Sequence, residues 1–182
     1  NPGSLASPFK TIGKGVSRLK AGDILYVRSG TYVERIYISQ SGTSVLPITI
    51  TGYPGENPVI DGNNRLPVGD WSSLIQLQGN YIHLSGFEVK NSNINGRYAG
   101  GAGIEIYGQH NKVSKMKVHH CWENGIIALG DYSIVEDCIV SMTVIVNSFN
   151  PGSRGSGSWS SGLSAARSPV DGITSNAILR RN

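Results

Sequence analysis

The densest run of reactive side chains in the sequence is His119-His120-Cys121-Trp122-Glu123. Imidazole nitrogens and thiolates are common zinc ligands, so a metal site is one interpretation of this run. Adjacent residues on an extended strand point to opposite faces, however, so we do not expect His119, His120 and Cys121 to converge on one ion. The run also lacks the C-x-x-C or H-x-x-x-H spacing that many metal sites share. We therefore favour a turn that carries Trp122, and we assign no metal ligand.

Four charged or imidazole side chains occupy equivalent outward positions of a sequence repeat. Glu88 aligns with Lys117, and Lys90 aligns with His119. Lysine and histidine can remove a proton as general bases, and ammonium groups attract sugar acids. Lys90, Lys117 and His119 are therefore candidate catalytic residues, and Glu88 is a candidate substrate-binding residue. The alternative is a column of exposed charges, in which each cross-strand pair contributes about 0.2–1 kcal/mol.

A second polar group surrounds Glu105, which lies between two isoleucines expected to point inward. Tyr107 and Gln76 are expected near the same face as Glu105. A carboxylate beside aromatic and amide groups could bind sugar hydroxyls, so Glu105 and Tyr107 are candidate substrate-binding residues. The alternative is an ordinary solvated strand face.

The segment 147–168 departs from the pattern of the remaining chain. It is rich in Ser and Gly and holds Arg154, Trp159 and Arg167 but no acidic residue. A long loop in a compact domain is usually functional or disordered. Trp159 could stack on a sugar ring while the two arginines hold its carboxylate, so all three are candidate substrate-binding residues. A flexible flap without a ligand is equally compatible with this composition.

Short strands must position these side chains, because apolar and polar residues alternate from Asp23 onward. The blocks Leu84–Val89, Val113–Val118 and Val135–Val140 align at spacings of 29 and 22 residues. A second block, Gly103–Gly108, repeats in phase 22 residues later. Each copy holds three short strands separated by Gly, Asn, Ser or Pro.

A repeat of about 22 residues with three short strands predicts an all-β parallel β-helix, in which each strand pairs with its equivalent in the next coil. We expect one domain over 1–182 with coils over 23–182, interrupted by the 147–168 loop. The crossover rule favours a right-handed helix. Leucine-rich repeats have a similar period, but this sequence lacks their Leu-x-x-Leu-x-Leu-x-x-Asn pattern. A β-sandwich ranks second, because the hairpin-like pairs Asn95-Gly96 and Asn124-Gly125 fall at corner positions of the repeat.

An amphipathic helix is predicted over 8–20, with Ser7 as its N-cap, Pro8 at its first position and Gly22 as a left-handed stop. An open solenoid exposes the core and strand edge of its first coil, so the apolar face of this helix is expected to cap it. That face consists of Phe9, Ile12, Val16 and Leu19.

Composition limits the partners of the chain. Its 182 residues carry 16 Lys and Arg against 12 Asp and Glu, a net charge of +4 that permits an acidic polymer as partner. The basic residues do not cluster, so a nucleic-acid partner is disfavoured, and no apolar run is long enough to span a membrane. Cys138 aligns with an inward position and Cys121 with a corner, and their pairing is left open. The absence of an initiating Met and the strand-like last residues suggest a segment of a longer protein.

Several motifs near the N-terminus form a recognisable series: Asn1–Ile12, Lys20–Val27, Ser29–Tyr32, Ser41–Thr43, Pro47–Ile50, Tyr53–Glu56 and Pro58–Gly62. This series resembles the entry region of secreted bacterial polysaccharide lyases of the pectate-lyase-like superfamily, which act on pectate, alginate or chondroitin. The resemblance implies a right-handed β-helix, a secreted or cell-surface location and a polysaccharide partner, with β-elimination of uronates as the reaction.

In that family a cation, often Ca²⁺ or an arginine, neutralises the uronate carboxylate while a base removes the neighbouring proton. Ca²⁺ is therefore a possible cofactor by resemblance only, since no acidic cluster of this sequence matches the family's calcium site. Inactive relatives carry the same entry region, so fold does not imply activity. The alternative function is a non-catalytic extracellular module, such as an adhesin stalk or a filament subunit that associates end to end through its open edges.

Overall fold

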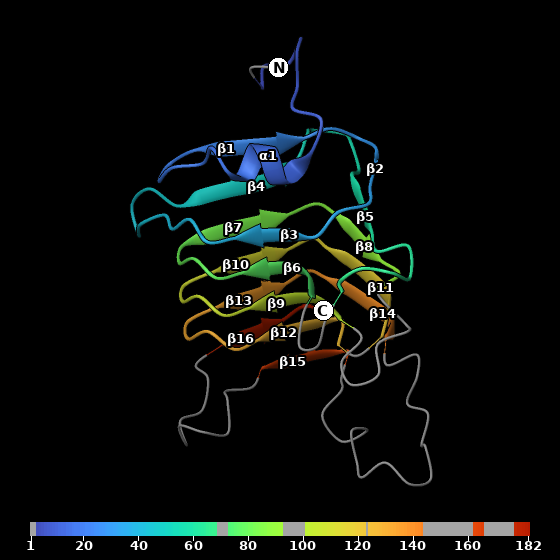
Figure 1. Cartoon of the computed structure of the whole chain (residues 1–182). Helices are drawn as coiled ribbons and strands as arrows, with labels where there is room; N and C mark the ends of the chain where they lie inside the picture. The colour runs from blue at the N-terminus through green and yellow to red at the C-terminus, as the bar shows by residue number, and fades with distance from the viewer. Residues whose placement is uncertain (1–2, 69–72, 93–100, 123, 144–161, 166–176) are drawn as a thin grey trace, which may run out of the picture.

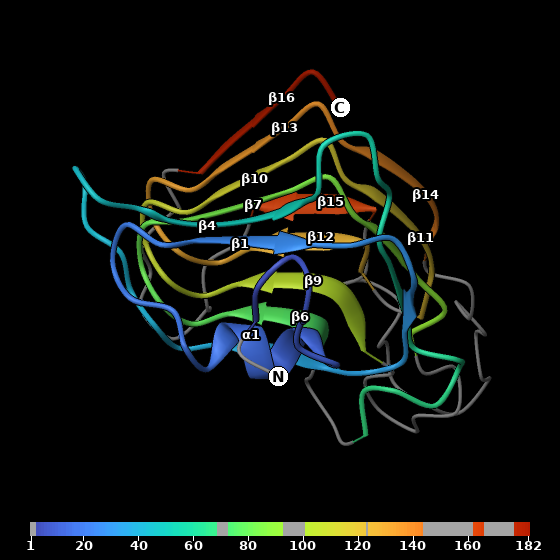
Figure 2. The same ribbon diagram turned by 90° about the horizontal axis from the view of Figure 1, so that it is seen from above.

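A computed structural model describes residues 3–68, 73–92, 101–122, 124–143, 162–165 and 177–182. The chain winds into a parallel β-helix in which successive coils add one strand to each of three sheets (Figure 1). Seen from above, the sheets form three sides of each coil (Figure 2). The expected all-β solenoid is confirmed, and the sandwich alternative is wrong, because every pairing between the named strands is parallel.

The strands of each sheet follow one another in coil order. The first sheet contains β1 (Ile24–Val27), β4 (Ile48–Gly52), β7 (Ile82–Ser85), β10 (Lys112–Ser114), β13 (Ile134–Glu136) and β16 (Ile178–Arg180). The second sheet contains β2 (Thr31–Tyr32), β5 (Val59–Asp61), β8 (Glu88–Lys90), β11 (Lys117–Cys121) and β14 (Ile139–Thr143). The third sheet contains β3 (Ile36–Ile38), β6 (Ser73–Leu77), β9 (Ala102–Ile106), β12 (Ile126–Ala128) and β15 (Leu163–Ala165).

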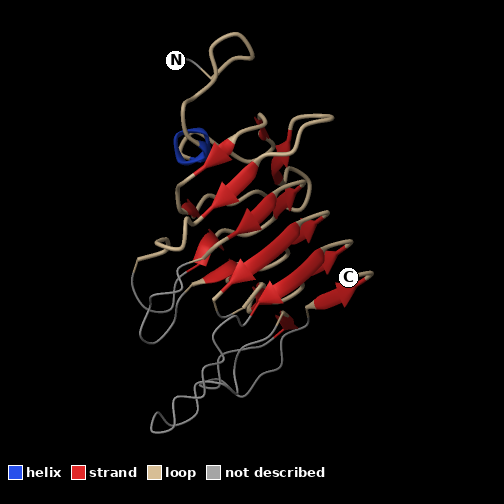
Figure 3. Ribbon diagram, turned by 90° about the vertical axis from the view of Figure 1, so that its right-hand side faces the viewer, coloured by secondary structure: helices blue, strands red, loops and turns tan. Residues whose placement is uncertain are grey.

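The register between coils agrees with the sequence repeat. Val113 pairs with Leu84 on one side and with Val135 on the other, and Ile104 pairs with Ile126 in the third sheet. The spacing of 22 residues describes only the shortest coils, because the connections between the sheets vary in length from coil to coil. The rows of stacked strands in Figure 3 keep their pairing despite these differences.

Alternating apolar residues fill the narrow core between the three sheets, and equivalent positions stack along the axis. Phe87, Met116 and Cys138 precede successive strands of the second sheet, and each is almost fully buried. The prediction that Cys138 is a core residue is confirmed. Cys121, assigned to a corner, is the last residue of β11, directly after the bend at His120. It is fully buried, and burial raises the pKa of its thiol to about 12. Both cysteines are free.

The predicted helix over 8–20 is wrong in its bounds, because the helix α1 covers only Ile12–Val16. Two glycines lie inside the predicted span and weaken it, while Ser7 bridges to Ser4 instead of capping the helix. The Thr11 side chain accepts the first cap bond from the Lys14 amide. Ile12 and Val16 still join the core at the N-terminal end of the coils, as the capping prediction requires.

The expected loop over 147–168 is also interrupted. Residues Leu163–Ala165 form β15, which pairs in parallel with β12 and continues the third sheet. The composition of this segment, rich in Ser and Gly, does not indicate a strand. Leu163–Ala165 are a strand because they pair with the edge strand β12.

A column of glycines brings the backbones of neighbouring coils together after the third sheet. The amides of Gly79, Gly108 and Gly130 donate to the carbonyls of Ile38, Leu77 and Ile106 respectively, one coil earlier. A Cβ atom added to Gly108 would lie 1.9 Å from the carbonyl oxygen of Gly79, and one added to Gly130 would lie equally close to that of Gly108. Only glycine fits this column.

An aromatic stack occupies the corner that follows these glycines. The rings of Tyr81, His110 and Tyr132 lie parallel, with centroids 4.8 Å apart in each successive pair. All three residues have a positive φ, near +55°, so the same backbone turn is repeated in each coil. The stacking distance matches the separation of neighbouring strands, which is about 4.8 Å.

Candidate functional site

Four sequence-predicted residues meet on the outward face of the second sheet, where β8 and β11 lie side by side. One carboxylate oxygen of Glu88, Oε1, lies 3.4 Å from the Lys90 Nζ and 3.2 Å from the His119 Nε2. Its other oxygen lies 3.6 Å from the Lys117 Nζ. The structure therefore brings Lys90, Lys117 and His119 together around a single carboxylate. We call these four residues the Glu88 cluster.

The electrostatics of the Glu88 cluster depend on partial burial. Only 14% of the Glu88 side chain is exposed, against 56% of that of Lys117. Burial by itself raises the pKa of Glu88, but hydrogen bonds from His119 and Lys90 and the charge of Lys117 outweigh it and hold this pKa below its ordinary value. Glu88 is therefore ionised at neutral pH, and the two lysines leave the cluster with a net positive charge.

His120 joins this group, contrary to the expectation that neighbouring side chains point to opposite faces. The Nδ1 atoms of His119 and His120 lie 2.6 Å apart, within hydrogen-bonding distance. The reason is the backbone, because His120 has φ +53° and leaves the extended conformation. The equivalent residues of the neighbouring coils, Asn91 and Met142, share this left-handed conformation. Alternation along a strand fails at such a corner.

The second predicted group lies on the third sheet and is more buried than expected. The Gln76 Nε2 donates to the Glu105 Oε2 at 3.3 Å, and Arg35 Nη2 donates to the Gln76 Oε1 at 2.6 Å. The solvated face that was the alternative for Glu105 is wrong, since Glu105 is buried. Burial and the neighbouring Glu105 raise the pKa of Tyr107. These contacts keep Glu105 and Tyr107 as candidate binding residues.

Sequence reasoning missed two members of these groups. Arg35 directly precedes β3 and lies outside the blocks that the sequence repeat aligns, so the repeat does not place it beside Gln76. His120 was set aside on strand geometry, although Asn91 one coil earlier is a residue type that tolerates positive φ. Arg154, Trp159 and Arg167 lie outside the described residues, so their predicted role stays a prediction.

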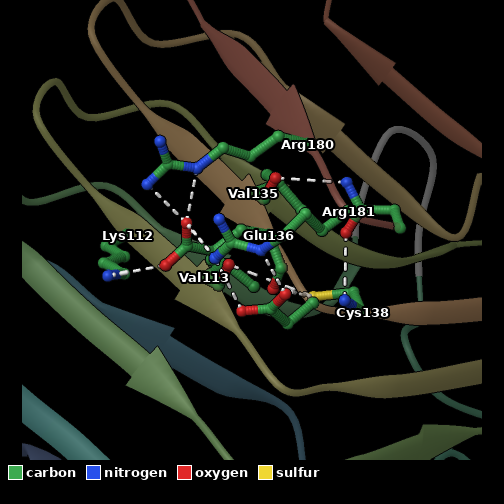
Figure 4. A network of polar contacts seen from close by, with 9 residues as sticks. Lys112, Val113, Val135, Glu136, Cys138, Arg180 and Arg181 are labelled. Atoms are coloured by element: carbon green, nitrogen blue, oxygen red, sulfur yellow. Dashed lines mark hydrogen bonds and ion pairs between the residues drawn. The ribbon is translucent and has the colours of Figure 1, made fainter.

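A third polar network, drawn in Figure 4, joins three coils of the first sheet. The Glu136 Oε1 lies 2.7 Å from the Lys112 Nζ, and its Oε2 lies 2.6 Å from the Arg180 Nη2 and 3.1 Å from the Arg181 Nη2. Hydrogen bonds from Lys112 and Arg180 lower the pKa of Glu136. Because β10, β13 and β16 each supply one charge or more to this network, we interpret it as a brace between coils.

This brace predicts a pH-dependent loss of stability in Glu136→Gln. A carboxyl whose pKa is lowered by folding stabilises the folded state above its unfolded pKa of about 4.3, and the contribution disappears as the pH falls through the lower folded value. Urea denaturation is therefore expected to show the variant less stable than the wild type at pH 7 and equal to it at low pH. Equal stability at pH 7 would contradict the brace.

Metal binding finds no support among the residues that the structure describes. None of their His, Cys, Asp and Glu side chains form a group of three or more that could hold an ion. Ca²⁺ prefers six to eight oxygen ligands, whereas the Glu88 cluster offers one carboxylate among cations. The Glu88 cluster therefore does not fit Ca²⁺. No helix within the described ranges is long and apolar enough to cross a membrane.

Comparison with known proteins gives one uncharacterized relative and two relatives named as pectate lyases among those that match. The uncharacterized protein YwoF of Bacillus subtilis is 29% identical over 115 residues, 63% of this chain and 25% of that protein. Pectate lyase PEL9 of Emericella nidulans is 37% identical over 62 residues, 33% of this chain and 15% of that protein. The chain thus spans a quarter or less of the length of these curated relatives.

Structural comparison and a family model agree on the fold. The crystal structure of pectate lyase Pel9A matches with a TM-score of 0.62 at 20% identity, over 79% of this chain and 36% of that chain. A family model described as the Pel9A-like, right-handed beta-helix region matches residues 1–174. Because this match covers almost the whole sequence, the chain belongs to the Pel9A-like family of right-handed β-helix proteins.

Proposed function

We propose that this protein is secreted, binds an acidic polysaccharide on the second sheet and cleaves it by β-elimination. The observation that carries the proposal is the Glu88 cluster, in which two lysines from neighbouring strands lie beside one carboxylate. An ammonium group has three donors, so Lys90 and Lys117 keep donors for a second carboxylate. The pectate lyase names of distant relatives support the same substrate class.

The chemistry requires charge neutralisation before proton removal. In a uronate the carboxylate is attached to C5, and its negative charge opposes loss of the C5 proton. Two ammonium groups beside that carboxylate stabilise the charge that develops as the proton leaves. The lysines would supply this effect from rigid strands, and no step of the proposal passes through Ca²⁺.

A binding measurement with Lys117→Met tests the first half of the proposal. Isothermal titration with short pectate, alginate and chondroitin oligomers is expected to give saturable binding to at least one of them. The variant is expected to weaken that binding about 10-fold, because one ammonium–carboxylate contact contributes about 1.4 kcal/mol, and to reduce its dependence on salt.

Lys10→Met is the matched control, because it removes the same charge from an exposed position outside the cluster. Equal weakening in both variants would show that only net charge matters and would contradict the assigned site.

The ultraviolet absorbance of the unsaturated product, followed with and without a chelator, tests cleavage. Binding without cleavage would favour the non-catalytic extracellular module.

A further inference from the structure

A chain of hydrogen-bonding groups runs along the second sheet from β8 to the bend at His120 within β11. It begins at the Glu88 carboxylate, whose Oε1 lies 3.2 Å from the His119 Nε2. It continues from the His119 Nδ1 to the His120 Nδ1 at 2.6 Å. Three side chains from two neighbouring coils are thus linked in series, and the last of them is partly exposed.

The ionised carboxylate of Glu88 determines which nitrogen atoms of His119 and His120 carry a hydrogen. An ionised carboxylate can only accept, so the His119 Nε2 carries the hydrogen that it donates to Glu88. In the neutral form of both rings each imidazole has one donor and one acceptor, so the His119 Nδ1 accepts from the His120 Nδ1–H. This leaves the His120 Nε2 without a hydrogen and with its lone pair available at the end of the chain.

We propose that the His120 Nε2 is the proton acceptor of the polysaccharide site, and that Glu88 and His119 are positioning residues that fix its tautomer. This inference rests on the proposed function and deepens it. A histidine whose other nitrogen is held by a hydrogen-bonded partner is a common arrangement for general bases. The lysines of the Glu88 cluster would hold the substrate carboxylate beside it.

The proposed reaction is an elimination in which His120 is the base. The His120 Nε2 takes the C5 proton of the uronate, and the C5–H electron pair forms the C4–C5 double bond. The C4–O4 bond breaks, and O4 leaves with its electron pair. That oxygen then takes the proton from the imidazolium, directly or through a water molecule, which restores neutral His120. The products are a saturated chain end and an unsaturated uronate.

Charges of both signs lie near His120, and the two lysines oppose a positive charge on its ring. Glu88 and Lys90 lie on the neighbouring strand β8, and Lys117 lies on the same strand as His120. Asp61 of β5 is hydrogen-bonded to Asn91, the residue equivalent to His120 one coil earlier, at 3.0 Å. On the other side, β14 presents Ser141 and Met142, which carry no charge. The carboxylate of Glu88 would stabilise the imidazolium through His119.

The neighbouring coil supplies the variant that tests this inference. Asn91 occupies the equivalent corner with φ +53°, the same value as His120. In His120→Asn the amide nitrogen can replace Nδ1 as donor to His119, whereas nothing replaces the distal Nε2. The variant therefore keeps the corner and its hydrogen bond while it removes the proposed base. His110→Asn is the matched control, because His110 has φ +56° and lies in the aromatic stack.

Two measurements test the proposal on the whole protein. Nitrogen NMR of histidine-labelled protein is expected to show hydrogen on the His120 Nδ1 and on the His119 Nε2. With the polyuronate that the wild type cleaves, His120→Asn is expected to lower kcat about 100-fold while KM changes less than about 2-fold. His110→Asn is expected to keep kcat. Glu88→Gln is expected to lower kcat less and to shift the pH profile, because the tautomer is no longer fixed.

The other results are distinguishable. Hydrogen on the His120 Nε2, or an unchanged kcat in His120→Asn, would overturn the inference and leave the proposed function standing. A wild type that binds a polyuronate without cleaving it would overturn the base assignment and the cleavage half of the proposed function, and would leave the binding half standing. A wild type that neither binds nor cleaves any polyuronate would overturn both.

Discussion

Gly108→Ala is expected to lower the free energy of unfolding by at least about 3 kcal/mol and Tm by about 10 °C. The added methyl group would meet the Gly79 carbonyl oxygen at 1.9 Å, well inside van der Waals contact. Relief by backbone movement is costly, because the Gly108 amide donates to Leu77 and its coil is paired on both sides. Thermal and urea denaturation followed by circular dichroism measure the loss.

Gly162→Ala is the control for this substitution. A Cβ atom there would lie 3.5 Å from the nearest atom, the Thr143 Oγ1, which is an ordinary contact. Its stability is expected to stay within about 1 kcal/mol of the wild type, because alanine also reduces the entropy of the unfolded chain. Equal stability of Gly108→Ala and the wild type would contradict the close approach of the coils.

Phe87→Ala is expected to cost about 3–5 kcal/mol, the range for truncating a fully buried phenylalanine. Phe87 is 1% exposed and fills the core where the first and second sheets meet. The equivalent position in the next coil holds the smaller Met116. We therefore expect the cavity left by Phe87→Ala to stay largely unfilled. Urea denaturation measures the change as a shift of the midpoint at constant slope.

Cys138→Ala provides the comparison within the same column. It removes one sulfur atom from a buried site, so a loss of about 1 kcal/mol is expected from the smaller transfer free energy. A loss for Phe87→Ala no larger than that for Cys138→Ala would show that the core at Phe87 relaxes around the cavity. That result would contradict the rigid stacking of inward residues.

The coil architecture is readable from the sequence because burial repeats in it. Inward residues such as Leu84, Val113 and Val135 recur at equivalent places, and their pairing in the structure agrees with their alignment. The helix bounds were not readable in the same way. The Ile12 and Gly13 amides donate to the Glu34 carboxylate, which lies a coil connection away, and no local signal reveals such a remote cap.

The candidate site was readable only in part. The outward pairs Glu88 with Lys117 and Lys90 with His119 follow from the repeat, and the structure confirms their pairing. The position of His120 depends on one backbone angle, which residue types alone do not fix because histidine is only enriched at positive φ. The burial of Glu105 depends on side chains that meet across coils, so period-2 alternation could not reveal it.

The varying connection between the second and third sheets has a consequence for how such proteins diversify. Residues 33–35 suffice to join β2 to β3, whereas 144–162 separate β14 from β15, yet both joints leave strand pairing intact. Insertions at this edge change only loop-closure entropy, which grows slowly with length. New surface segments can therefore be acquired or exchanged along one side of the solenoid without refitting the core, which makes this edge a natural place for grafting foreign peptides.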